Sequence, residues 1–119
     1  MNTNYDVSVV IINYNSKKYI DNLFESLIKL KHSDFTFQIV VVDNASTDDS
    51  IEYLESRHFD EYIPVKIVKS DVNRGFAGGN NFGVKYSDSE YIVFLNNDTA
   101  VDEMWLENLY HFIRDRKDC

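Results

Sequence analysis

The sequence contains one cysteine, one proline and four glycines in 119 residues. Because the cysteine is the last residue, Cys119, an internal disulfide is excluded, and with it the class of small disulfide-stabilised scaffolds. No apolar run approaches the ~18 residues of a membrane span, and the first residues lack the basic and apolar regions of a secretion signal. The hydrophobic content of 44% and the aromatic content of 14% instead predict one globular domain.

Positive charge is also scarce, with 12 lysines and arginines against 20 aspartates and glutamates, giving a formal net charge of -8. Such a chain repels nucleic acid and anionic membrane surfaces, so we expect neither as a partner. A bound phosphate would therefore have to be held by local groups or by a cation. The three histidines are far apart in the sequence, and no cluster of cysteine and histidine indicates a zinc site.

Four short apolar segments alternate with helical patterns. Their β-branched residues are typical of strands covered on both faces, and they span residues 7–12, 38–43, 65–70 and 91–96. Apolar spacing predicts a helix from a cap at Ser16 to about Leu30, and a last helix over residues 101–116. The alternation predicts an α/β fold, with a parallel sheet, right-handed crossovers and helices on both faces.

Two further helix starts are predicted from local signals. Ser46, with Asp49 three residues later, resembles a capping box and predicts the start of the second helix. All four glycines lie in GFAGGNNFG, residues 75–83, where we expect the third helix to begin near Ala77 or Gly78. Their concentration there is informative, because glycine allows the backbone either to turn tightly or to approach a ligand closely.

Polar residues follow every predicted strand at its end. In parallel sheets the carboxyl ends of the strands lie along one edge, and ligands bind outside that edge. We therefore expect a single cleft built from the strand ends. Its candidate residues are Asn13, Tyr14, Asn15, Asp43, Asn44, Asp71, Val72, Asn73, Arg74, Gly75, Asn96, Asn97 and Asp98.

Asp98 offers a carboxylate at the mouth of a buried strand, between amide and hydroxyl neighbours. These hard oxygen donors suit Mg²⁺ or Mn²⁺ bound jointly with the phosphates of a ligand. One carboxylate makes a weak site by itself, so a diphosphate would complete the coordination. The alternative is that Asp98 and Thr99 only cap the following turn. Tyr14 is either a stacking platform for a base or an ordinary aromatic residue at a strand end.

Asp43 and Arg74 each allow two interpretations. The carboxylate of Asp43 could accept hydrogen bonds from a base or a ribose, or it could cap the next turn through the amides of Ala45 or Ser46. The guanidinium of Arg74 is planar and always charged, which suits contact with a phosphate or a base. The alternative is a surface arginine paired with Asp71.

Four sequence blocks occur in order: VSVVIINYN, VVVDNASTDDS, NRGFAGGNNFG and FLNNDT. Together they resemble the inverting, nucleotide-sugar-dependent glycosyltransferases of family 2, which have the GT-A fold, from Val7 to Thr99. NRGFAGGNN and LNNDT are similar to the rhamnosyltransferase-like branch. The resemblance implies a Rossmann-like sheet of strand order 3-2-1-4. It also implies that residues 1–119 are the N-terminal, donor-binding part of a longer, here truncated, glycosyltransferase domain.

The resemblance implies a role for each strand-end residue. Tyr14 would lie against the nucleobase, Asp43 would bind the base or ribose, and Arg74 would lie near the nucleotide. The other residues implied to bind the nucleotide are Asn13, Asn15, Asn73, Gly75, Asn96 and Asn97. Asn96 stands where the metal-binding DxD motif has its first acidic residue, so only Asp98 is implied to bind Mn²⁺ or Mg²⁺.

The resemblance further implies inverting transfer of a sugar from a UDP-sugar or dTDP-sugar to a glycan or lipid-linked acceptor, in polysaccharide or cell-surface glycan synthesis. We expect a cytoplasmic location, with the periphery of the membrane as the alternative for the full-length protein. The general base is expected beyond Cys119, so this chain alone should be inactive. The alternative function is a binding or structural module that keeps the fold without activity.

Overall fold

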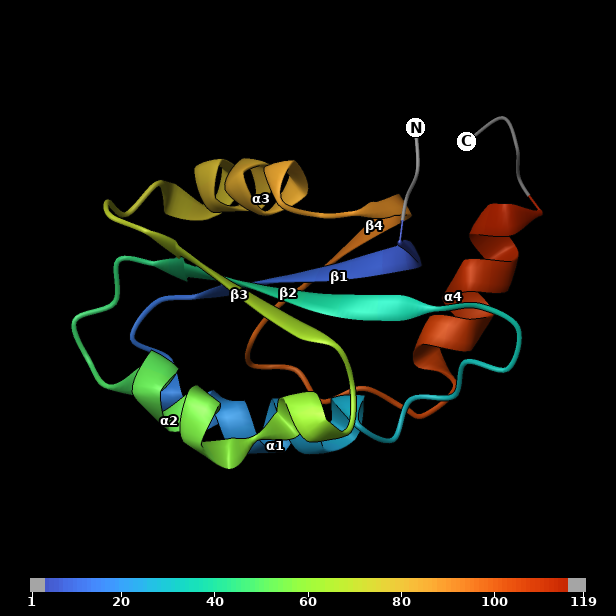
Figure 1. Ribbon diagram of the computed structural model, residues 1–119, viewed down its shortest axis with the longest axis horizontal. Helices are drawn as coiled ribbons and strands as arrows, with labels where there is room; N and C mark the ends of the chain where they lie inside the picture. The colour runs from blue at the N-terminus through green and yellow to red at the C-terminus, as the bar shows by residue number, and fades with distance from the viewer. Residues whose placement is uncertain (1–3, 116–119) are drawn as a thin grey trace.

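Residues 4–115, the part that the computed structural model describes, form a four-stranded sheet between two layers of helices (Figure 1). All strand pairs are parallel and the order is β3-β2-β1-β4, which confirms the predicted order. The elements are β1 (Tyr5–Asn13), α1 (Lys17–Leu27), β2 (Phe37–Asn44), α2 (Ser50–Arg57), the 3-10 helix η1 (Phe59–Glu61), β3 (Val65–Ser70), α3 (Gly75–Lys85), β4 (Ser89–Leu95) and α4 (Trp105–Arg114).

The two central strands carry an apolar cluster on each face. Successive side chains of a strand point to opposite faces, so a strand covered on both sides is apolar throughout. On one face Val9 and Ile11 of β1 join Ile39 and Val41 of β2 in the larger cluster, which includes residues of α1, α2 and α4. On the other face a smaller cluster lies beneath α3, centred on Val10, Val40 and Val42. Figure 1 shows α3 on one side of the sheet, with α1 and α2 on the other.

The glycines of α3 allow this helix to lie close to the sheet. A Cβ atom added to Gly83 would lie 2.5 Å from Cγ1 of Val10, and one added to Gly79 would lie 3.0 Å from Cδ1 of Ile12. Residues four apart share one helix face, so both glycines face the sheet. Gly75 is the one glycine of the four with a positive φ, +72°. Close helix packing therefore explains Gly79 and Gly83.

Of the two predicted helix caps, one is confirmed in position and the other is wrong. Ser16 is the N-cap residue of α1, as predicted, but its hydroxyl donates to the backbone carbonyl of Tyr14 and makes no side-chain cap. The predicted capping box of Ser46 and Asp49 is absent, because α2 begins at Ser50 and Asp49 makes no side-chain cap. The hydroxyl of Ser46 instead accepts hydrogen bonds from the loop that follows β1.

Other boundaries also differ from the sequence prediction. α1 ends at Leu27 rather than near Leu30, and α3 begins at Gly75, before the expected start. α4 spans Trp105–Arg114, so residue 101, where the helix was expected to begin, lies in irregular chain before a turn at residues 103 and 104. Within residues 4–115, no helix is both long and apolar enough to cross a membrane.

Candidate functional site: a cleft at the strand ends

A cavity of about 340 Å³ opens beside the carboxyl ends of β1 and β4. Its lining residues are Ile12, Tyr14, Ser16, Phe76, Leu95, Asn96, Asn97 and Asp98. The fold thus brings Tyr14 together with the three predicted residues that follow β4. Phe76, which is 63% exposed, was missed from the sequence. An aromatic residue inside a glycine-rich, polar stretch was the signal that could have identified it.

The oxygen atoms near Asp98 fit a cation only in part. Asp98 is exposed, and the hydroxyl of Thr99 lies 3.4 Å from its Oδ1 atom, a long hydrogen bond that leaves the turn-capping alternative open. No group of three or more histidine, cysteine, aspartate or glutamate side chains among residues 4–115 could hold a metal ion. This donor set therefore fits a cation that shares its coordination with an anionic ligand.

Asp43 lies outside the cavity lining and is held by Asn13, its partner in the β1–β2 register. Asn13 is 4% exposed and Asp43 is 8% exposed. Nδ2 of Asn13 donates to Oδ1 of Asp43 at 3.1 Å, and also lies 2.8 Å from Oγ of Ser50 and 3.2 Å from Oγ of Ser46. Within residues 4–115, neither the amide of Ala45 nor that of Ser46 donates to Asp43, so the predicted cap does not form.

Asn15 joins the loop after β1 to the loop after β2. Its Oδ1 atom accepts from the backbone N–H groups of Thr47, at 2.8 Å, and Asp48, at 3.1 Å. Its own N–H donates to Oγ of Ser46 at 3.0 Å. Asn15 and Ala45 both adopt positive φ values, 48° and 63°, so each loop turns sharply next to its strand. The two loops therefore form one hydrogen-bonded unit beside Asp43.

Asp48 fixes the direction of a hydroxyl within this unit. Burial opposes ionisation of Asp48, but hydrogen bonds from the hydroxyl and the backbone N–H of Ser50 hold the pKa of Asp48 below its ordinary value. Because the Ser50 hydroxyl donates to Asp48, its oxygen is available to accept from Nδ2 of Asn13. The chain of hydrogen bonds from Asn13 through Ser50 thus ends on a charged carboxylate.

Arg74 also lies outside the cavity lining, and it does not pair with Asp71. Its Nε donates to Oγ of Ser70 at 2.8 Å, and its guanidinium carbon lies 4.6 Å from the centre of the Phe82 ring. No carboxylate of residues 4–115 forms an ion pair with Arg74. The positive charge is therefore held in place without an internal counter-ion.

The turn that carries Arg74 is fixed at several atoms. Oδ1 of Asn73 accepts from the N–H of Gly75 at 2.8 Å. Asn44, the last residue of β2, bonds to the backbone of both Arg74 and Gly75. Neither Asn73 nor Gly75 lines the cavity, so the predicted residues fall into three neighbouring groups rather than one.

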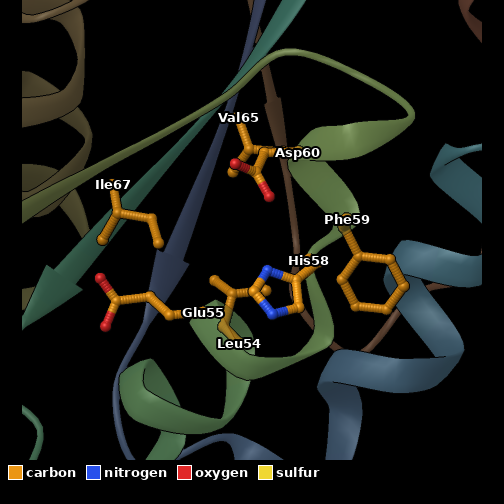
Figure 2. A pocket seen from close by; sticks show the side chains of 7 residues that line it. All are labelled: Leu54, Glu55, His58, Phe59, Asp60, Val65 and Ile67. Atoms are coloured by element: carbon orange, nitrogen blue, oxygen red, sulfur yellow. The ribbon is translucent and has the colours of Figure 1, made fainter.

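A second cavity, of about 410 Å³, lies elsewhere in the structure (Figure 2). Figure 2 shows side chains of α2, η1 and β3 around it, namely Leu54, Glu55, His58, Phe59, Asp60, Val65 and Ile67. Although it is larger, it lies beside the amino-terminal half of the edge strand β3, and none of the predicted strand-end residues lines it. The cavity at the carboxyl ends is therefore the candidate site.

A parallel sheet with polar strand ends beside a cavity defines the class of α/β proteins that bind ligands at the carboxyl ends of their strands. The sequence matches the model of the family described as "Glycosyl transferase family 2" over residues 8–119. The chain belongs to this family.

Named relatives agree with this assignment. The chain is 31% identical over 107 residues to the poly(ribitol-phosphate) β-N-acetylglucosaminyltransferase TarS of Staphylococcus aureus, covering 89% of this chain and 18% of TarS. It is 31% identical over 114 residues to the minor teichoic acid biosynthesis protein GgaB of Bacillus subtilis, covering 96% of this chain and 13% of GgaB. The chain thus spans less than a fifth of the length of these two relatives.

Solved structures match the fold. The crystal structure of S. aureus TarS 1-349 superposes with a TM-score of 0.82 at 29% identity, covering 94% of this chain and 33% of that structure. The same protein has been solved in complex with UDP and with UDP-GlcNAc. A mannosyltransferase of Pyrobaculum calidifontis, in complex with GDP-Man and Mn²⁺, has the same fold, with a TM-score of 0.73 at 22% identity over 90% of this chain and 32% of that structure.

Proposed function

We propose that the protein containing this chain is a glycosyltransferase that binds a nucleoside-diphosphate sugar with a divalent cation and transfers the sugar, with inversion, to an acceptor hydroxyl. One observation carries the proposal: in a chain of this family, the cavity at the strand ends combines the carboxylate of Asp98 with the aromatic side chain of Tyr14. The complexes of TarS with UDP and UDP-GlcNAc support the choice of ligand class.

Asp98 is the residue proposed to hold Mn²⁺ or Mg²⁺, with the amide oxygens of Asn96 and Asn97 nearby in the same cavity. A bound cation would offset the negative charge of the departing diphosphate. The presence of Mn²⁺ in the structure of the P. calidifontis mannosyltransferase supports this assignment at the level of the fold.

Asp43, near the end of β2, and Arg74, in the turn after β3, are proposed to bind the nucleotide. An ionised carboxylate only accepts hydrogen bonds, so Asp43 suits the N–H of a uracil or thymine, or the hydroxyls of a ribose. Arg74 has no internal counter-ion among the described residues and suits a phosphate oxygen. The complexes of TarS with UDP and UDP-GlcNAc support UDP-sugars, with dTDP-sugars as the related alternative, as the proposed donors.

The acceptor is proposed to be a glycan or a lipid-linked carrier in cell-surface polysaccharide synthesis, at a cytoplasmic site or at the periphery of the membrane. TarS is named as a poly(ribitol-phosphate) transferase and GgaB as a minor teichoic acid biosynthesis protein, and these names support polymer synthesis as the context of the proposal. The second candidate is a binding module that retains the nucleotide site without transfer. Nucleotide binding does not separate the two candidates, whereas sugar transfer by the full-length protein does.

The test is a calorimetric titration of the 119-residue chain with UDP, dTDP and GDP, each in Mn²⁺ and in EDTA. We expect UDP or dTDP to bind more tightly in Mn²⁺ than in EDTA. If none of the three binds under either condition, the donor site assigned to this cleft is wrong. If binding is equally tight in EDTA, the metal role of Asp98 is wrong.

A further inference from the structure

Strand β2 ends in two polar residues that serve opposite faces of the sheet. Asp43 bonds to Asn13 on the side of α2, whereas the next residue, Asn44, faces α3. Asn44 is 2% exposed. Its Oδ1 atom accepts from the backbone N–H of Arg74 at 2.8 Å, and its Nδ2 atom donates to the backbone carbonyl of Gly75 at 3.1 Å. One buried amide therefore bonds to two consecutive residues, 30 positions away, at the start of α3.

The surrounding packing fits this amide closely. A Cβ atom added to Gly79 would lie 3.2 Å from Nδ2 of Asn44 and 3.0 Å from Cδ1 of Ile12. The absence of a side chain at Gly79 thus leaves room for the Asn44 amide between α3 and the sheet. Gly75, with its φ of +72°, lets the chain turn sharply at the point that Asn44 holds. A single acceptor or a single donor at position 44 could not make both bonds.

The residue held in this way carries an uncompensated positive charge. Ser70 and Phe82 fix the guanidinium of Arg74, and Asn44 fixes its backbone. No carboxylate within residues 4–115 pairs with it, although the chain has a net charge of -8. Holding a cation in one orientation without a counter-ion lowers the ordering cost of binding an anion there.

We propose that Asn44 is a positioning residue that orients Arg74 toward the anionic part of a nucleoside diphosphate. The inference rests on the proposed function, because it takes a nucleoside diphosphate as the ligand of Arg74. Asn44 itself touches no ligand, since it is buried beneath the turn. Any effect of Asn44 on nucleotide affinity must therefore act through Arg74. A general contribution of Asn44 to stability would instead affect affinity whether or not Arg74 is present.

The test is a double-mutant cycle on UDP binding in Mn²⁺, measured by calorimetry on the 119-residue chain. Loss of one charge-assisted hydrogen bond by Arg74→Ala should weaken binding by about 10-fold or more. Asn44→Ala should weaken binding about 5-fold to 10-fold, and the double variant should bind within about twofold of Arg74→Ala alone. Asn22→Ala, a change of an exposed asparagine in α1, is the matched control and should leave affinity unchanged.

A salt series adds a measurement that a purely structural role would not alter. Raising NaCl from about 50 mM to about 500 mM should shrink the effects of Asn44→Ala and Arg74→Ala together, because both report the same screened charge. Asn44→Leu, which keeps the approximate size and removes both hydrogen bonds without adding a charge, replaces Asn44→Ala if that variant does not fold. Hydrogen exchange at residues 73–76 should be faster in either variant.

The outcomes separate the two hypotheses. If the wild-type chain binds UDP but Asn44→Ala and Asn44→Leu leave affinity unchanged, the positioning role is wrong. It is equally wrong if the losses from Asn44→Ala and Arg74→Ala multiply in the double variant. If the wild-type chain binds no nucleoside diphosphate at all, the proposed function fails and the role of Asn44 fails with it.

Discussion

Asn13 ends β1 and Asp98 follows the neighbouring strand β4, but their environments differ. The amide of Asn13 is buried and its hydrogen atoms are shared among Asp43, Ser46 and Ser50. Asp98 is exposed and contacts Thr99 alone among the side-chain hydrogen bonds within residues 4–115. An amide NH₂ whose hydrogen atoms are already shared has little capacity to donate to a ligand, whereas an exposed carboxylate is available to bind one. At the residue scale, we therefore expect the largest binding effects at exposed or partly paired groups.

Asp43→Ala should weaken the binding of UDP or dTDP without unfolding the domain. The lost interactions are one or two charge-assisted hydrogen bonds, on the order of 1.5–3 kcal/mol each. Calorimetry measures the affinity, and circular dichroism checks the fold. If Asp43→Ala unfolds the domain while binding per folded molecule stays the same, Asp43 has only a structural role.

Asp98→Ala should abolish the difference in UDP affinity between Mn²⁺ and EDTA. A cation and a diphosphate that share one coordination shell each raise the affinity of the other by the same factor. The measurement is the UDP affinity of each variant at a series of Mn²⁺ concentrations. Asp60→Ala, which removes an exposed carboxylate at the second cavity, is the matched control and should retain the Mn²⁺ effect. A retained effect in Asp98→Ala would assign the cation to another group.

At the scale of elements, the stability of the site depends on how the helices meet the sheet. α3 approaches β1 and β2 through Gly79 and Gly83, and its first turn carries the backbone that Asn44 holds. On the other face, α1 and α2 are joined by polar contacts around Asp21. Because these helices are short, their stability depends on such tertiary contacts more than on intrinsic helix propensity.

Gly83→Ala should lower the free energy of unfolding by about 1–3 kcal/mol, because its Cβ would lie 2.5 Å from Cγ1 of Val10 and 3.0 Å from Cγ2 of Val42. The better helix propensity of alanine offsets only about 1 kcal/mol of this cost. Urea unfolding measures the change. Val84→Ala, at the neighbouring exposed position, should have a much smaller effect. An unchanged or more stable Gly83→Ala would show that α3 can move away from the sheet at little cost.

Asp21 should make a pH-dependent contribution to the contact between α1 and α2. The hydroxyl of Tyr53 donates to Asp21 and, together with Arg57, holds the pKa of Asp21 below its ordinary value. Since the folded-state pKa is lowered, this stabilisation is present above about pH 4 and is lost as the pH falls through the folded-state pKa.

The matched variant for this prediction is Asp21→Asn. The difference in unfolding free energy between wild type and Asp21→Asn should be constant near neutral pH and shrink toward zero in acid. Urea unfolding at a series of pH values from about 7 to about 2.5 measures it. A difference that does not depend on pH would show that the charge of Asp21 contributes nothing to the contact.

At the scale of the whole molecule, the chain should bind a donor nucleotide but transfer no sugar. An inverting displacement needs a base within hydrogen-bond reach of the acceptor hydroxyl. Asp98 is the one carboxylate among the residues that line the cavity, and it is assigned to the cation. Incubation of the 119-residue chain with a radiolabelled UDP-sugar and candidate acceptors measures transfer. Robust turnover would show that a base lies within residues 1–119.

The sequence by itself determined the strands and showed that the polar residues lie at the edge formed by the carboxyl ends of the strands. Apolar, β-branched runs indicate buried strands wherever they occur, and the ends of parallel strands must share one edge. The register pairing of Asn13 with Asp43 follows from these runs once the strands are adjacent. The strand order itself came from the family resemblance, and the structure confirms it.

Only the tertiary structure decided which of these polar residues share a cavity and which hold one another. Ser16 and Ser46 had the local pattern of helix caps, but their hydroxyls bond within and between loops instead. The close packing at Gly79 and Gly83 could not be predicted, because the sequence does not show that a strand lies against them. Asn44 and Arg74 are 30 positions apart, so their contact depends on how α3 lies across the sheet. Local patterns report local periodicity, whereas the partner of a polar group depends on what the fold places beside it.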